Sequence, residues 1–254
     1  MNRRWLISPQ TGPLVRLRLF CFPFAGGSAT AYQSWRRLAS PRLQVCGVEY
    51  PGRGTCFDEE PFMSLPGLVR HLADQIGPLL DRPFAFFGHS MGGLVAFELA
   101  RTLRERCWQE PAHLFISATA EPARPPHRTA LYRASDEEVL DELRDLGGTP
   151  PELLADRELM AMTARVLRAD YTALGTYEYR RTAPLAVPMT VFGGRADPIT
   201  APADLRGWQA QTVAGCRFQM FPGDHFYLNA AAAEILRAVE DTVDDHLKIV
   251  VPAT

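Results

Sequence analysis

The sequence predicts an α/β fold with a mostly parallel sheet flanked by helices. Short apolar runs alternate with segments of helical periodicity along the chain. The runs are almost continuously apolar, which is typical of strands in a parallel sheet that helices cover on both faces. With 254 residues and 46% hydrophobic content, the chain is long enough to bury a large core. We therefore expect one α/β domain over residues 1–254.

The order of the elements can be read from these patterns. A helix is expected after Ser64, a suitable N-cap, because apolar residues follow it at spacings near three and four. A second helix should follow Ser90 to about residue 106, and a last one should cover about 230–247. Short connections between alternating strands and helices favour right-handed crossovers. The strands are expected at 17–22, 43–48, 84–87, 113–117, 189–192 and 217–221.

The sequence Gly-His-Ser-Met-Gly at 88–92 stands between a predicted strand and a predicted helix. A serine at such a sharp turn holds its hydroxyl above the edge of the sheet, where a base can reach it. The flanking glycines are needed because a Cβ there would collide with the strand or the helix. An ordinary glycine-rich turn is the alternative, but the motif and its context favour Ser90 as a catalytic nucleophile.

A serine hydroxyl attacks well only when a base takes its proton and an acid holds the base. Among six histidines, His225 lies directly after the last predicted strand and before the last helix, so it is the expected general base. Asp197 follows the penultimate strand and is the expected acid, although an Asp-Pro turn explains it as well. A structural loop histidine is the alternative at 225. Asp224, Asp204 and Asp170 are the rival acids.

The oxyanion of such a reaction needs two positioned N–H donors. The amide of Met91, the residue after the nucleophile, is one candidate at the start of a helix. The glycine-rich loop after the first long strand is expected to supply the other, and Ala25 N–H is the candidate there.

Residues 121–183 break the alternation, because they contain helical patterns at 136–146 and 158–174 and no strand pattern. They could be extra helices packed on the sheet. We favour a helical lid inserted between two strands, which would cover the serine and shape an acyl pocket.

Composition excludes several classes of function. The net charge of −2 leaves no broad basic surface for nucleic acid, and no apolar run approaches the length of a membrane span. Five cysteines without C-x-x-C spacing suggest neither a disulfide framework nor a zinc site. The N-terminal apolar stretch is too short for a signal peptide. We expect a monomeric cytoplasmic protein without a metal or a cofactor.

Taken together, these segments resemble the type II thioesterases, which are stand-alone α/β-hydrolases serving polyketide and non-ribosomal peptide synthases. The Gly-His-Ser-Met-Gly turn at 88–92 (the nucleophile elbow) would fit any esterase. The Pro-Gly-Arg turn and the stretch at 146–154 are much more specific to this family. Integrated thioesterase domains usually carry the acid after the strand that follows the elbow helix, and residues 116–120 contain none. The matching motifs are Phe-Pro-Phe-Ala-Gly-Gly at 22–27, Tyr-Pro-Gly-Arg-Gly at 50–54, Gly-His-Ser-Met-Gly-Gly at 88–93, Leu-Gly-Gly-Thr-Pro-Pro-Glu-Leu-Leu at 146–154, Gly-Gly-Arg-Ala-Asp-Pro at 193–198 and Gly-Asp-His-Phe at 223–226.

The resemblance implies an α/β-hydrolase fold and hydrolysis of acyl groups from the phosphopantetheine arm of an acyl or peptidyl carrier protein. Phe24 stands where family members commonly carry histidine, so the mouth of the site is expected to be more apolar. Phe24 and Arg53 are candidate substrate-binding residues, with a solvated turn residue as the alternative for Arg53. Two other functions stay open: an esterase or acyltransferase for free esters, and a non-catalytic module that binds carrier proteins.

Overall fold

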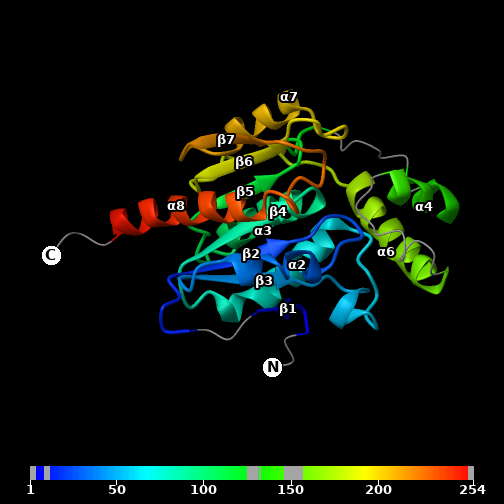
Figure 1. Ribbon diagram of the computed structural model, residues 1–254, viewed down its shortest axis with the longest axis horizontal. Helices are drawn as coiled ribbons and strands as arrows, with labels where there is room; N and C mark the ends of the chain where they lie inside the picture. Colours follow the sequence, from blue (N-terminus) through cyan, green and yellow to red (C-terminus); the bar gives the residue numbers. More distant parts are fainter. Residues whose placement is uncertain (1–3, 9–11, 125–130, 132, 146–156, 251–254) are drawn as a thin grey trace.

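The computed structural model describes residues 4–8, 12–124, 131, 133–145 and 157–250. Within these residues the chain forms a seven-stranded sheet in the order β1-β3-β2-β4-β5-β6-β7 (Figure 1). All neighbouring strands are parallel except β1 and β3. The mostly parallel sheet of an α/β fold is therefore confirmed. The strands are β1 Leu6–Ile7, β2 Leu17–Phe22, β3 Leu43–Val48, β4 Phe84–His89, β5 Leu114–Ser117, β6 Met189–Gly194 and β7 Cys216–Phe221.

Most strand predictions hold to within two residues. The strands at 17–22 and 43–48 have the expected bounds, whereas the one expected at 84–87 continues to His89. The two extra residues extend β4 to the start of the serine turn. Strand β1 is absent from the predictions, because two residues are too few to show a periodic pattern.

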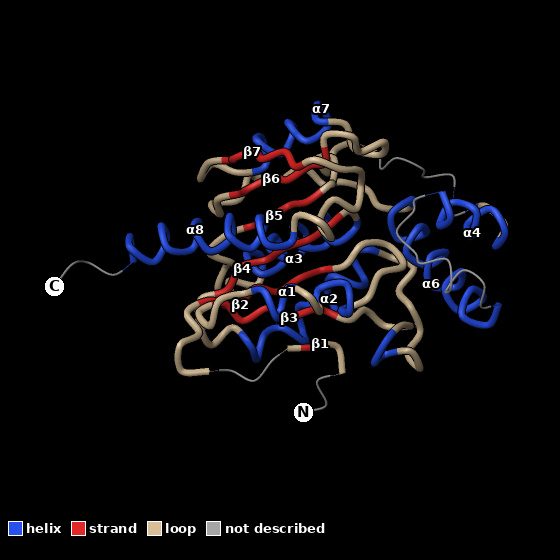
Figure 2. Tube along the Cα trace, viewed as in Figure 1, coloured by secondary structure: helices blue, strands red, loops and turns tan. Residues whose placement is uncertain are grey.

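Helices cover both faces of the sheet, as Figure 2 shows with helices in blue and strands in red. Side chains alternate along β4, so that Phe84 and Phe86 join the core beneath α2 and α3. Ala85 and Phe87 join the core on the other face, with α1 and α8. The helices are α1 Trp35–Leu38, α2 Leu65–Ile76, α3 Met91–Glu105, α4 Asp136–Asp145, α6 Arg157–Gly175, α7 Pro202–Leu205 and α8 Ala232–Val250, with 3-10 turns η1 Ala29–Tyr32, η2 Gly54–Cys56, η3 Gly77–Leu79 and η5 Arg206–Gln211.

The helix predictions also hold in outline. Ser64 caps α2 as expected, because its hydroxyl accepts a hydrogen bond from Gly67 N at 3.4 Å. Helix α3 ends at Glu105, and α8 begins two residues later than expected, at Ala232.

The segment between β5 and β6 carries α4 and α6, which pack against each other to one side of the sheet (Figure 1). Both helices match the helical patterns of the sequence to within one residue. No strand occurs among the described residues of this segment, as expected. The motif at 146–154 lies outside the described residues.

Candidate active site

Ser90 lies in a strained turn between β4 and α3. Its backbone angles are φ 53° and ψ −121°, a combination that residues with a side chain rarely adopt. The turn is fixed from both sides, since Ser90 N donates to Ser117 O at 2.8 Å and Ser90 O accepts from Gly93 N at 2.9 Å. The Thr119 hydroxyl also donates to Ser90 O, at 2.7 Å. Backbone strain of this kind persists only where the surroundings hold it, and it is common at functional sites.

The glycines around Ser90 are required by close backbone contacts, as expected from the motif. A Cβ on Gly88 would lie 2.0 Å from Gly92 O. A Cβ on Gly92 would lie 2.1 Å from Phe22 O, at the end of β2. The start of α3 therefore lies directly against the strand end that leads into the loop of Ala25.

His225 and Asp197 meet at the same edge of the sheet, although they lie on loops after different strands. His225 Nδ1 is 2.9 Å from Asp197 Oδ2, and the His225 residue is only 4% exposed. The other carboxylate oxygen of Asp197 accepts from Ile199 N at 2.8 Å and from Thr200 N at 3.1 Å. Asp197 thus forms the Asp-Pro turn and also contacts His225, so the two interpretations of this residue are compatible.

The protonation of this pair follows from its surroundings. Burial alone raises the pKa of the Asp197 carboxyl, but the hydrogen bond and charge of His225 and the two loop amides bring it below its ordinary value. Asp197 is therefore ionised at neutral pH and accepts from Nδ1–H of His225. The second ring nitrogen, Nε2, is then the one able to take a proton.

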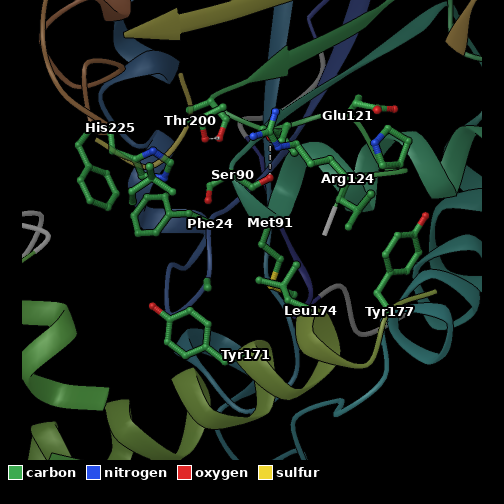
Figure 3. Close-up of a pocket in the computed structure, with 18 residues that line it drawn as sticks. Phe24, Ser90, Met91, Glu121, Arg124, Tyr171, Leu174, Tyr177, Thr200 and His225 are labelled. Atoms are coloured by element: carbon green, nitrogen blue, oxygen red, sulfur yellow. Dashed lines mark hydrogen bonds between the residues drawn. The ribbon is translucent and has the colours of Figure 1, made fainter. Parts of the chain in front are cut away.

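Ser90 and His225 line one pocket, shown in Figure 3. Both oxyanion candidates, Ala25 and Met91, also line it, as does Phe24. The Phe24 ring packs against Phe226 with centroids 4.9 Å apart, which makes this part of the pocket apolar. The remaining lining residues come mainly from α3, α6 and the loops after β5 and β6: Leu94, Ala118, Thr119, Ala120, Glu121, Pro122, Arg124, Tyr171, Leu174, Tyr177, Ile199 and Thr200.

Arg53 is not among the described residues that line the pocket. Its guanidinium forms two hydrogen bonds with the Asp170 carboxylate, at 2.7 and 2.8 Å. The alternative of a solvated turn residue is wrong, because Arg53 is buried.

The rival acids all have partners other than His225. Asp170 binds Arg53, Asp204 pairs with Arg124, and Asp224 accepts from the Phe226 amide at 2.8 Å. Asp197 is the one that contacts the ring of His225 among the described residues.

Several pocket residues were not singled out from the sequence. Tyr171 and Leu174 are one turn apart on α6, and Tyr177 follows the end of that helix. Their apolar spacing predicts a buried helix face, but it does not say that this face meets the edge of the sheet beside Ser90.

Two negative findings concern only the part of the chain that the structure describes. No group of three or more histidine, cysteine, aspartate or glutamate side chains there could hold a metal ion. No helix there is both long and apolar enough to span a membrane.

Comparison with known proteins places this chain in a family. A family model described as a thioesterase domain matches residues 17–243. The gramicidin S biosynthesis protein GrsT of Aneurinibacillus migulanus is 38% identical over 233 residues, covering 92% of this chain and 91% of that protein.

Solved structures agree with this match. RedJ, a thioesterase of the prodiginine pathway in Streptomyces coelicolor, is 34% identical with a TM-score of 0.85, over 90% of this chain and 91% of RedJ. YbtT, a type II thioesterase of the yersiniabactin pathway, is 30% identical with a TM-score of 0.85, over 95% of this chain and 99% of YbtT. The chain therefore belongs to the thioesterase family, alongside type II thioesterases of non-ribosomal peptide and polyketide pathways.

Proposed function

We propose that this thioesterase uses Ser90, His225 and Asp197 to hydrolyse acyl groups from the phosphopantetheine arm of acyl or peptidyl carrier proteins. The proposal depends on one observation: Ser90 and His225 line the same pocket, and Asp197 is hydrogen-bonded to Nδ1 of the His225 imidazole. The biosynthetic pathways named for GrsT, RedJ and YbtT support carrier-bound thioesters as the substrate class. Removal of stalled or wrongly primed acyl groups is the role that fits similarity to type II thioesterases.

In the first half of the reaction, Ser90 Oγ attacks the thioester carbonyl carbon while His225 Nε2 takes the hydroxyl proton. The carbonyl oxygen becomes an oxyanion, which the amides of Met91 and Ala25 stabilise. The carbon–sulfur bond then breaks, and His225 returns the proton to the departing thiolate. Such a thiol has a pKa near the ~8.5 of cysteine, so it needs less protonation than an alkoxide would.

In the second half, a water molecule attacks the acyl–Ser90 ester and His225 takes one of its protons. Collapse of the second oxyanion breaks the ester bond, and the proton on His225 goes to Ser90 Oγ. The products are the free acid and the regenerated enzyme. Asp197 orients the imidazole and stabilises its charged form in both halves.

This mechanism also orients the substrate in the pocket. The leaving sulfur must lie beside His225, which protonates it, so the pantetheine arm occupies that side of Ser90. The acyl chain then extends away from His225. Figure 3 shows Tyr177 on the opposite side of Ser90 from His225, with Leu174 between Ser90 and Tyr177. We therefore assign the region of Leu94, Leu174 and Tyr177 to the acyl chain.

The cysteines support a cytoplasmic location, which fits a carrier-protein partner. All five of them are free, and free thiols are usual in a reducing compartment.

The proposal is tested by comparing acyl-loaded carrier proteins with oxygen esters of the same acyl groups. We expect a strong preference for the thioesters. Ser90→Ala should lower turnover by roughly 10⁴- to 10⁶-fold while the circular dichroism and melting temperature stay unchanged. Ser64→Ala, which removes only a helix cap, serves as the control and should cost about 1 kcal/mol of stability without loss of turnover. A preference for oxygen esters, or an active Ser90→Ala variant, would refute the proposal.

A further inference from the structure

The loop at 23–28, which carries Ala25, is held by side chains from distant parts of the chain. Asp170 of α6 accepts a hydrogen bond from Gly26 N at 2.7 Å. Arg53 donates from Nη1 to Gly27 O at 3.2 Å. The two residues that follow Ala25 are therefore anchored by one acidic and one basic side chain.

The same two side chains bind each other. Arg53 Nη1 lies 2.7 Å from Asp170 Oδ2, and Arg53 Nη2 lies 2.8 Å from Asp170 Oδ1. Their side chains are only 7% and 2% exposed. A two-pronged pair of this kind fixes direction as well as distance. Burial of both charges is costly, however, and an apolar pair of similar size is often as stable. Stability alone is thus a weak explanation for this pair.

Helix α6 packs closely against the loop at 23–28. Gly26 has a φ of +73°, and a Cβ on it would lie 2.6 Å from Leu167 Cδ2 of α6. The loop therefore has little freedom to move towards the helix. Within the described residues, Ala25 N makes no hydrogen bond, whereas the amides of Gly26 and Gly27 each have an acceptor.

We propose that Arg53 and Asp170 are positioning residues, which hold the Gly26–Gly27 backbone so that Ala25 N–H points at the oxyanion. This inference rests on the proposed function, in which Ala25 is an oxyanion donor. Asp170 lies on α6, which also supplies Tyr171 to the pocket. The pair thus connects α6, which lines the acyl side of the pocket, to the loop whose Ala25 N–H stabilises the oxyanion.

Loss of the Arg53–Asp170 pair should lower the catalytic rate and leave substrate binding nearly unchanged. Neither Arg53 nor Asp170 is among the described residues that line the pocket. Their loss should therefore leave the contacts between the pocket and the acyl chain of the bound substrate in place. A displaced donor, in contrast, weakens an interaction that becomes strong only in the transition state. Removal of one oxyanion donor costs about 10²- to 10³-fold in kcat, and a displacement should cost somewhat less.

The test replaces both charges together with apolar residues, in the double variant R53M/D170L. Because both members of the pair are replaced, neither of them is left as an unpaired buried charge. Glu49 loses the nearby charge of Arg53, and its raised pKa allows it to take up a proton instead. We expect kcat on an acyl-pantetheine thioester to fall by roughly 10- to 100-fold, with KM changed by less than about threefold. An alkyl trifluoromethyl ketone adds a second readout, because its adduct with Ser90 carries an oxyanion. Its inhibition constant should weaken in parallel with kcat/KM.

Arg18→Met is the matched control, since Arg18 is a buried arginine at the start of β2 that pairs with Asp81. It should change stability and leave kcat and ketone binding as in the wild type. If R53M/D170L does not fold, Arg53→Lys decides the question, because lysine keeps the charge and loses the two-pronged geometry. Arg53→Lys should lower kcat and weaken inhibition by the ketone by the same factor.

A folded double variant, or failing that a folded Arg53→Lys, with wild-type kcat and ketone affinity would overturn the inference. That result differs from failure of the proposed function. In the latter case the wild type would not hydrolyse the thioester, or Ser90→Ala would remain active.

Discussion

The imidazole rings of His89 and His225 lie beside each other, with centroids 5.2 Å apart, yet they have different partners. His225 Nδ1 faces the Asp197 carboxylate, whereas His89 Nδ1 lies 2.8 Å from the hydroxyl of Ser117. That hydroxyl is in turn 2.5 Å from the Tyr227 hydroxyl. One histidine therefore has a charged partner and the other has only neutral ones.

We predict that His89 stays neutral at pH 6 and above. Complete burial is the main cause that lowers the pKa of His89 well below its ordinary value, and the charge of His225 lowers it further. Because His89 is neutral, His225 can become charged during the reaction without repulsion from a second imidazolium next to it. Nitrogen-15 NMR of the imidazoles measures this, and loss of one signal in His89→Gln assigns it. A His89 signal that is half protonated near pH 6.5 would contradict the prediction.

The site residues that could be predicted are those that follow strands. In a parallel sheet the strand ends meet at one edge, so Ser90 after β4, Asp197 after β6 and His225 after β7 all reach the same place. Nearly continuous apolar runs made β4 and β6 recognisable, and the bounds of β2 and β3 follow from the same signal. Strand β7 instead alternates polar and apolar residues.

The pairing of Arg53 with Asp170 could not be predicted in this way. The two residues are 117 positions apart, and charged side chains carry no periodic signal that shows which ones meet. Asp170 is on a helix face that also carries apolar residues, and only the packing of α6 against the loop of Gly26 shows why a carboxylate is buried there.

The length of the acyl pocket is predicted to depend on Tyr177. Its hydroxyl donates to Glu98 Oε1 at 2.6 Å, and Arg101 donates to the same oxygen at 2.6 Å, so the ring is held in place at the pocket. Tyr177→Ala should shift the preference towards longer acyl chains, with the ratio of kcat/KM for long and short chains rising by about 10-fold or more. A panel of acyl-pantetheine thioesters of increasing length measures this ratio.

Tyr177→Phe is the control for the ring. It keeps the aromatic wall and loses only the hydrogen bond to Glu98, so its preference should remain close to that of the wild type. An unchanged chain-length profile in Tyr177→Ala would place the acyl chain elsewhere in the pocket.

Gly92 is predicted to tolerate no side chain. A Cβ there would lie 2.1 Å from Phe22 O and 2.7 Å from Pro23 O, both rigid backbone atoms. Gly92→Ala should destabilise the protein by about 3 kcal/mol or more, since neither α3 nor β2 can shift without loss of packing. Urea unfolding measures the change.

Gly67→Ala provides the comparison, because Gly67 is also helical and its Cβ would lie 3.2 Å from the movable ring of Phe62. Alanine favours a helix over glycine by up to about 1 kcal/mol, so this variant should be close to neutral or more stable. Equal losses of stability in the two variants would show that the contact with Phe22 is not what excludes a side chain at residue 92.

Glu49 is predicted to make stability depend on pH. It is completely buried and accepts from Ala29 N at 3.1 Å. Burial raises the pKa of its carboxyl from 4.5 to about 6, against the opposing effects of the Ala29 amide and the charge of Arg53. Between these two pKa values the folded state binds the proton more tightly than the unfolded state. The free energy of unfolding due to Glu49 therefore falls as pH rises from 4.5 to 6, by about 2 kcal/mol.

Glu49→Gln removes this dependence and keeps an oxygen that can accept from Ala29 N. The stability of the variant relative to the wild type should thus increase by about 2 kcal/mol between pH 4.5 and pH 7 and stay level above that. Urea unfolding of both proteins at several pH values isolates this difference, because all other titrating groups are shared. A difference that is constant over this range would mean that Glu49 ionises as easily in the folded protein as in the unfolded chain, and that burial beside Arg53 costs its carboxylate nothing.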